Sequence, residues 1–508
     1  MTTPLRGFKW FKNLEINIFI KNNGTTKTQQ IVTRVTLNPP TAFKKKPLSA
    51  QQLITTMHPR HLSILLICFL SFILVFQSSV RHDLPLSWDV WYHLRISRQF
   101  STGEFTWDSG SFGPEGRSHS YPPVFHVMTA LIYTAGIPLE EIARFLPPFL
   151  FVLTIFSFYI LVKEVLNEKI ALIACLFATV SPIILDRAMS YTPEALSFIL
   201  FNLGLTFFWK GNWKMTGLLG GLLVLTHGIT SAAFFSILVL YTFFSLLVLK
   251  ENYLKNLFLV IILSAFIASI WALQGIPAFV PYGGKEPLQL YPQKLGWIQC
   301  LLAFLGLTHI SKDKKSIFVL SFAGTLFLLS QNPVSLPYRF IEFLAFPVCM
   351  LAGAGLYHLK NRKYFTAIFL LFVLSFAQGY WYTEKYNPVV THEEEAAFHW
   401  LNTNSVKGCT IMCEWRTAPI LAFFSGKAPV KGAYQFGAPE IRERTEDTLL
   451  FYTEYPEYLV SKYDISHVYY GLEEKKYAYT EPPFDKVYSS LHTGSYLIYH
   501  QPTLPTPF

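Results

Sequence analysis

Long runs of apolar residues recur between positions 61 and 383, separated by short polar segments. An α-helix needs about 20 predominantly apolar residues to cross the hydrocarbon core of a bilayer. This pattern predicts about eleven membrane spans, near residues 61–80, 145–163, 169–186, 193–209, 215–229, 230–249, 256–275, 294–310, 316–330, 337–357 and 364–383. We therefore predict an α-helical polytopic membrane protein with a membrane domain over 61–383.

One further apolar stretch, Pro122 to Ile137, is shorter and follows Tyr121. It is predicted to be a re-entrant or interfacial helix, because counting it as a span would invert every later loop. The loop that contains it, 81–144, is then unusually long. Long ordered loops often carry function.

Lysine and arginine residues lie between alternate predicted spans, and an excess of these residues marks the cytoplasmic side. All five clusters of these residues fall on the same side of the predicted spans. Their position places the N-terminus in the cytoplasm and the loop 81–144 outside. The protein is predicted to lie in the cell membrane, or in the endoplasmic reticulum membrane of a eukaryote. The clusters are Lys163 and Lys169; Lys210 and Lys214; Lys250 and Lys255; Lys312, Lys314 and Lys315; Lys360, Arg362 and Lys363.

The first 60 residues hold ten Lys/Arg and one acid, Glu15. We predict a disordered basic cytoplasmic tail, and Met57 is an alternative start. Anionic lipid or nucleic acid would be attracted to such a tail. A nucleic-acid role would rest on the tail alone, so we predict no nucleic-acid partner. Over the whole chain only 15% of residues are charged, against about 25% in ordinary soluble domains.

Charged residues become frequent again over 384–508, where strand-like and helical patterns alternate. Such alternation predicts a small α/β domain, here on the extracytoplasmic side. The expected strands are 409–413, 467–470 and 496–500. The expected helices are 393–401, 440–452 and 458–463.

Two acidic residues, Asp89 and Glu194, fall at the outer ends of hydrophobic spans on the same predicted side. Acids are costly near hydrocarbon and usually mark a functional site. Carboxylate oxygens that converge are the ligands preferred by hard divalent cations. Structural alternatives exist, because Asp89 can cap a helix and Glu194 follows Pro193 in a helix's opening turn. The pair nevertheless favours a membrane enzyme over a passive bundle.

Several short motifs, in order along residues 57–471, resemble those of oligosaccharyltransferase catalytic subunits, which have the GT-C fold. The stretch from Asp89 to Arg95 resembles the family's Asp-Pro-aromatic-aromatic-His/Asn-x-Arg motif. The further matches are Tyr121-Pro122, Arg187 followed by Glu194, Arg339-Phe340 and the segment Tyr458–Val468.

The resemblance implies transfer of a sugar or oligosaccharide from a polyprenyl (di)phosphate to an acceptor, asparagine of a protein above all. It implies Mn²⁺ or Mg²⁺ at the donor phosphate. The implied metal ligands are Asp89 and Glu194, with Asp186 or Asp83 as the further carboxylate. Arg339 would bind phosphate oxygens, since a guanidinium presents a matching fork. Glu286 would position the acceptor, and the remaining implied substrate-binding residues are His93, Arg95, Arg187 and Trp415.

The chain departs from the family at two places. Thr192 stands where the second loop normally has an Asp, so one carboxylate is missing. Arg416 follows Trp415 where the outer domain normally has an Asp, and an Arg cannot accept a hydrogen bond from a hydroxyl. Three alternatives stay open: a transferase that uses a polyprenyl-monophosphate sugar and a glycan or lipid acceptor, a transporter of lipid-linked sugars, and a non-catalytic homologue.

Overall fold

The computed structural model describes most of the chain in two units, Met1–Leu62 and Ser63–Phe508. The described residues are 14–21, 30–37, 59–119, 121–272, 284, 286–333, 336–359, 365–384, 386–432, 438–478, 480–490 and 494–500.

The first unit contains a two-stranded antiparallel sheet, β1 (Leu14–Lys21) and β2 (Gln30–Leu37). The register pairs Leu14 with Leu37 and Lys21 with Gln30. Isoleucine and valine recur through both strands, and β-branched residues favour extended backbone. The disordered basic tail expected over 1–60 stays a prediction.

Each predicted span coincides with a helix or a helix pair of the second unit. The helices are α2 (Pro59–Arg81), α6 (Pro147–Val165), α7 (Glu168–Thr179), α8 (Pro182–Met189), α9 (Pro193–Trp209), α10 (Trp213–Val224), α11 (Gly228–Phe244), extended by η2 (Ser245–Leu249), α12 (Leu254–Ala272), η3 (Leu288–Leu290), α13 (Tyr291–Leu295), α14 (Trp297–Leu307), α15 (Lys314–Ser330), η4 (Pro337–Arg339), α16 (Phe340–His358) and α17 (Phe365–Glu384).

Fewer of these helices are long enough to span a membrane unaided. By length and composition, five helices in the described part of the chain qualify. The pair α7 and α8 qualifies as a sixth if it is one span bent by 65°. Pro182 begins α8 at that bend, where a proline cannot continue the preceding hydrogen-bond ladder. The number of spans, about eleven, therefore stays a prediction.

The loop 81–144 is ordered around α3 (Asp89–Ser101), which packs on α4 (Val124–Thr134) and α5 (Leu139–Phe145). Strands β3 (Trp107–Asp108) and β4 (Arg117–Ser118) form a short hairpin between α3 and α4. At 1.5 Å per residue, α4 is only about 17 Å long, so it is too short to cross the bilayer. This agrees with the re-entrant or interfacial helix expected there.

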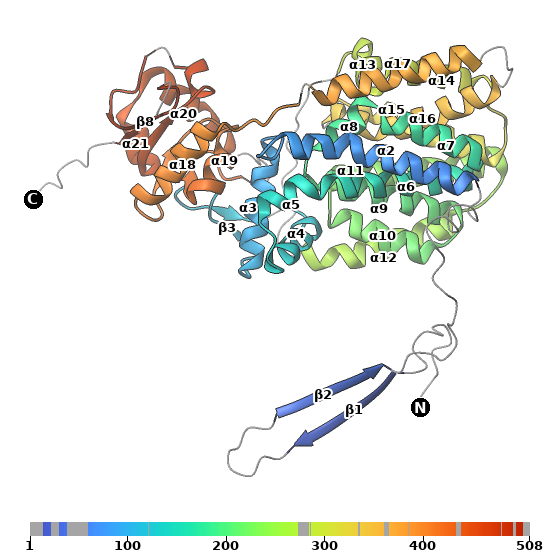
Figure 1. Cartoon of the computed structure of the whole chain (residues 1–508), viewed down its shortest axis with the longest axis horizontal. Helices are drawn as coiled ribbons and strands as arrows, with labels where there is room; N and C mark the ends of the chain where they lie inside the picture. Colours follow the sequence, from blue (N-terminus) through green and yellow to red (C-terminus); the bar gives the residue numbers. More distant parts are fainter. Residues whose placement is uncertain are drawn as a thin grey trace, which may run out of the picture. The chain divides into compact units, whose positions relative to one another are not determined.

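The C-terminal residues form the expected α/β domain around a five-stranded sheet of order β6-β5-β7-β9-β8. Strand β5 runs parallel to β6 and β7, whereas β9 runs antiparallel to β7 and β8. Helix α19 packs against α3, which joins the domain to the loop 81–144 (Figure 1). The elements are α18 (His392–Asn404), β5 (Thr410–Met412), α19 (Ala418–Ser425), β6 (Ala428–Pro429), α20 (Ile441–Glu454), α21 (Glu457–Tyr463), β7 (Ile465–Tyr470), η6 (Glu474–Lys476), β8 (Asp485–Ser489) and β9 (Leu497–His500).

Candidate active site

Four charged side chains form a continuous cluster of alternating sign in the second unit. Arg187 donates from Nη2 to Glu342 Oε1 at 2.7 Å. Arg339 Nε lies 3.1 Å from the same oxygen, and Arg339 Nη2 donates to Glu194 Oε1. The two carboxylate side chains are only 2% and 4% exposed. Buried charges persist when each is paired, as these are.

Helix ends bring these residues together. Arg187 is in the last turn of α8, Glu194 in the first turn of α9, and Glu342 in the first turn of α16, directly after Arg339 of η4. Pro193 begins α9 in the position where proline is favoured, and acids are favourable near helix N-termini. The local sequence therefore orients each carboxylate, and the packing of the helices makes them meet.

His227 extends the cluster beyond Glu194. It caps α11, and its Nδ1 accepts a hydrogen bond from the Thr230 backbone N–H. In the neutral ring the proton is then on Nε2, which lies 3.4 Å from Glu194 Oε1. Glu194 thus lies between a guanidinium and an imidazole.

Asp89 is beside this cluster, in the first turn of α3. Burial raises the pKa of its carboxyl, while the positive charges of Arg339 and Arg187 act on it and lower that pKa. The predicted pair, Asp89 and Glu194, therefore shares the electrostatic environment of Arg339.

The third predicted metal ligand, Asp186, is held by other partners, and its Oδ2 lies 3.7 Å from Arg187 Nε. Tyr386 donates its hydroxyl to Asp186 Oδ1 at 2.6 Å, and Tyr382 does so at 3.3 Å. Within the described residues, no group of three or more His, Cys, Asp or Glu side chains is arranged to hold a metal ion. The side chains present do not fit the implied three-carboxylate site, because Arg339 already pairs with Glu194, and Tyr382 and Tyr386 hold Asp186.

A pair of buried histidines joins the helix of Asp89 to its neighbour, with His93 on α3 and His126 on α4. His126 Nδ1 lies 3.2 Å from the Pro122 carbonyl oxygen, which can only accept, so Nδ1 carries the proton. His126 Nε2 must then accept from His93 Nδ1, 3.0 Å away, which leaves His93 Nε2 as an acceptor. Burial lowers the pKa of His93 to about 3. His93 is therefore a neutral base of defined tautomer.

Two other predicted site residues pair outside the cluster. Arg95 forms an ion pair with Asp108 at 2.7 Å and donates to Ser111, which holds the β3–β4 hairpin onto α3. Glu286 lies 2.6 Å from Lys294 Nζ, ahead of α13. Their implied roles in substrate binding and acceptor positioning stay predictions.

Trp415 of the C-terminal domain contacts Trp88, the residue before Asp89. Its ring packs edge-on against Trp88, with centroids 5.0 Å apart and an interplanar angle of 89°. Arg416 stacks over the Trp415 ring at 5.1 Å. The loop after β5 therefore lies next to the start of α3, where an acceptor-binding residue was expected.

Sequence reasoning did not select Glu342 or His227 for the site. A signal existed for Glu342, because it follows Arg339 by three residues and so shares a helix face. The signal for His227 was weaker, since a histidine directly before a helix also reads as a simple cap.

No protein-family profile matches the chain, and no curated protein matches it significantly. Solved structures are similar in fold. The oligosaccharyltransferase AglB of Archaeoglobus fulgidus, in complex with an inhibitory peptide and a dolichol-phosphate, has a TM-score of 0.67 at 14% identity, covering 88% of this chain and 75% of that one. The Archaeoglobus fulgidus oligosaccharyltransferase complex with Zn and sulfate has a TM-score of 0.66 at 15% identity, covering 86% and 73%. ArnT from Cupriavidus metallidurans, bound to undecaprenyl phosphate, has a TM-score of 0.59 at 13% identity, covering 89% and 98%.

Proposed function

We propose that the protein is a membrane glycosyltransferase that moves a sugar or oligosaccharide from a polyprenyl (di)phosphate to an acceptor. Its fold is the GT-C fold expected from the sequence, which the similar solved structures confirm. The observation that carries the proposal is the buried cluster of Arg187, Glu342, Arg339 and Glu194 with Asp89 beside it. AglB and ArnT, which share the fold, have been solved with dolichol-phosphate and undecaprenyl phosphate.

The donor phosphate would be held by Arg339, with Arg187 supporting the same charge. When the bond from the anomeric carbon to the phosphate oxygen breaks, its electron pair stays on that oxygen. A lipid phosphate thus gains negative charge in the transition state, which a positioned guanidinium stabilises more than the ground state. Glu342 holds both guanidiniums in place, at 2.7 and 3.1 Å.

The acceptor would give its proton to a carboxylate as it attacks the anomeric carbon. Asp89 and Glu194 are the candidates, and the raised pKa of Asp89 favours proton uptake at neutral pH. His93 would help to orient the acceptor through its unprotonated Nε2. Each of these steps would be carried by the side chains named above.

Protein asparagine is the acceptor implied by the resemblance to oligosaccharyltransferases. A second candidate function is transfer of a polyprenyl-monophosphate sugar to a glycan or lipid. Arg416 favours this second candidate, because it replaces a hydrogen-bond acceptor with a cation, 51% exposed beside Trp415. An anionic group on the acceptor would suit that position.

We place the site on the extracytoplasmic side, with the membrane domain over 61–383 and the outer domain over 384–508. The basis is the lysine pattern. The cluster lies at the end of α8 and the starts of α9, α11 and α16. Lys210 follows the other end of α9, and Lys163 and Lys315 lie at the end of α6 and the start of α15.

The test is transfer of labelled sugar by the purified full chain. Diphosphate-linked and monophosphate-linked donors would each be supplied with an Asn-x-Thr peptide and with a glycolipid. We expect transfer that is lost in Asp89→Asn and Glu194→Gln. It should be kept in Glu164→Gln, whose partner Lys210 lies at the opposite end of α9 from Glu194. Glycopeptide from the diphosphate donor would identify an oligosaccharyltransferase. Glycolipid from the monophosphate donor would identify the second candidate. Donor binding without transfer to either acceptor would refute the proposal.

A further inference from the structure

A pocket of about 200 Å³ lies at the opposite end of α16 from Arg339. Glu342 and His358 are separated by 16 residues of this helix, which corresponds to about 24 Å. That distance approaches the roughly 30 Å thickness of the hydrocarbon core. The pocket is therefore on the other face of the membrane, the face that carries the lysine clusters.

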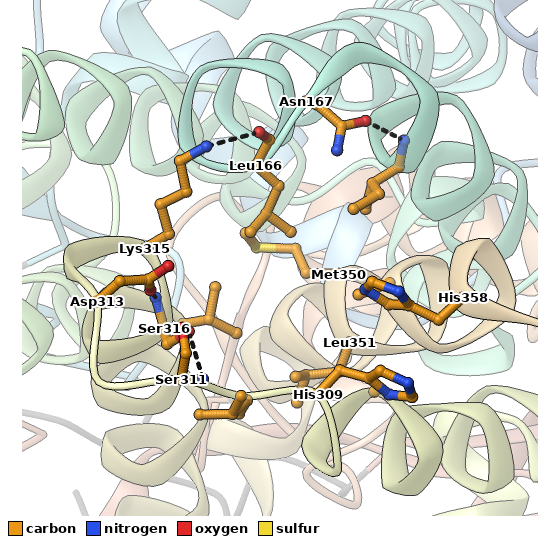
Figure 2. A pocket seen from close by; sticks show the side chains of 15 residues that line it. Leu166, Asn167, His309, Ser311, Asp313, Lys315, Ser316, Met350, Leu351 and His358 are labelled. Atoms are coloured by element: carbon orange, nitrogen blue, oxygen red, sulfur yellow. Dashed lines mark hydrogen bonds between the residues drawn. The ribbon is translucent and has the colours of Figure 1, made fainter.

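The polar side of the pocket is rich in hydrogen-bond donors (Figure 2). Lys315 Nζ donates to the Leu166 carbonyl oxygen at 3.2 Å, and an ammonium has two further donors. Asn167 Oδ1 caps α7 by accepting from the backbone N–H groups of Lys169 and Ile170. The Nδ2 group of Asn167 has no acceptor among the described residues, so it remains a donor for a ligand.

Two imidazole rings form a second polar wall. His309 and His358 stack with centroids 4.2 Å apart and an interplanar angle of 5°, and Figure 2 shows them side by side. The one acid in the lining, Asp313, is engaged as the cap of α15, where it accepts from the Ser316 backbone N–H at 2.8 Å.

The remaining wall is apolar and includes Ile170, Val319 and Met350. The helices on this side also expose large apolar side chains, as lipid-facing helices do, with Phe304 69% and Leu307 39% exposed on α14. An amphipathic pocket beside an apolar outer surface suits a molecule with a charged head and a hydrocarbon tail.

We propose that this pocket binds phosphate, as the headgroup of an anionic membrane lipid. Basic pockets between membrane helices on the cytoplasmic side bind such headgroups. Lys315 would supply the charge and Asn167 Nδ2 a hydrogen bond, while the apolar wall would hold the start of the acyl region. Free phosphate shares the same recognition chemistry and is the other source of the ligand.

The experiment measures binding by the purified full chain in nanodiscs and detergent. Nanodiscs of phosphatidylcholine would be compared with nanodiscs that also contain phosphatidylglycerol, and inorganic phosphate would be titrated in detergent. We expect saturable stabilisation by phosphatidylglycerol over phosphatidylcholine. Stabilisation by inorganic phosphate alone would also support the site and would identify the free anion as its source. Lack of both effects would overturn the proposal.

Two variants locate the binding. Lys315→Met is expected to weaken it about tenfold to a hundredfold, since hydrogen bonds to charged groups are of that strength. Asn167→Asp keeps the helix cap, because Asn and Asp cap about equally well, but it replaces the donor with a negative oxygen, so binding should also weaken.

Lys255→Met removes an exposed lysine of the same face outside the pocket, and Lys315→Arg preserves the charge. Both controls should bind normally. Equal weakening in Lys255→Met and Lys315→Met would show general attraction to a basic face and would overturn the proposal.

Discussion

Glu342 is the residue whose replacement tests the cluster most directly. Its Oε1 atom accepts a hydrogen bond from Arg187 Nη2 at 2.7 Å and lies 3.1 Å from Arg339 Nε. The Glu342 side chain is 2% exposed. Glu342→Gln keeps the size and shape of the side chain but removes the negative charge. Arg187 and Arg339 then lose the carboxylate that they share.

The expected magnitude follows from these two contacts. A hydrogen bond to a charged group contributes about 1.5–3 kcal/mol, and breaking a buried ion pair by removing one partner costs about 3–5 kcal/mol. We therefore expect Glu342→Gln to lower the free energy of unfolding by about 3–5 kcal/mol. Sugar transfer should also fall, because each guanidinium loses one of the carboxylates that orient it.

Glu164→Gln is the matched control. Glu164 pairs with Lys210 at 2.8 Å, but the two side chains are 37% and 43% exposed. Exposed ion pairs contribute about 0–1 kcal/mol, so this variant should resemble the wild type. The assay is thermal unfolding of the purified chain in detergent, followed by tryptophan fluorescence.

A double-mutant cycle with Arg187→Gln separates the pair from other effects. The two residues contact each other. The double variant should therefore lose less free energy of unfolding than the two single variants lose in total, and the difference should be about 0.5–3 kcal/mol. Strict additivity, or a Glu342→Gln melting temperature equal to that of Glu164→Gln, would refute the assigned cluster.

Three further predictions concern pH, metal and acceptor. Burial raises the pKa of Glu394 from 4.5 to about 8, so the folded state retains a proton that the unfolded state loses between these values. Stability should fall as pH rises from 6.5 to 8, by up to about 1.4 kcal/mol per pH unit, and less steeply in Glu394→Gln; equal slopes in calorimetry would contradict this. Because the described residues form no three-ligand site, EDTA should leave the melting temperature unchanged. Stabilisation by Mn²⁺ that disappears in Asp89→Asn would contradict this and would show a cation site. Trp415→Ala removes an edge-on aromatic contact with Trp88, of a kind that contributes about 0.5–1.5 kcal/mol. It should therefore raise KM for the acceptor and leave donor binding intact. Steady-state kinetics with Trp415→Phe as the control would test this, and an unchanged KM in Trp415→Ala would contradict it.

The regular elements follow closely from local sequence. The predicted span 193–209 is α9, and the predicted strand 467–470 lies within β7. Both follow from hydrophobic periodicity over a few residues. The sequence did not predict α19, β6 or β8, and β6 is a strand of only two residues, too short for such a pattern.

Part of the candidate site was named from sequence. Asp89 and Glu194 were selected because acids at the ends of apolar runs are costly unless they are used, whereas Arg187 and Arg339 were implied by the resemblance to oligosaccharyltransferases. The structure brings these four together. Their side on the membrane was inferred from lysine counts and remains a prediction.

The sequence by itself therefore determined the local features: which segments form helices, and which acids lie at the ends of apolar runs, where they are costly. Only the tertiary structure decided the partners, because these lie far apart in the chain. Glu194 and Arg339 are 145 residues apart and yet pair. Asp186 lies 3.7 Å from its sequence neighbour Arg187, yet its shorter contact, at 2.6 Å, is with Tyr386, 200 residues away. The role of a carboxylate depends on which charged group the packing of the helices places beside it. A pattern of a few neighbouring residues does not contain this information.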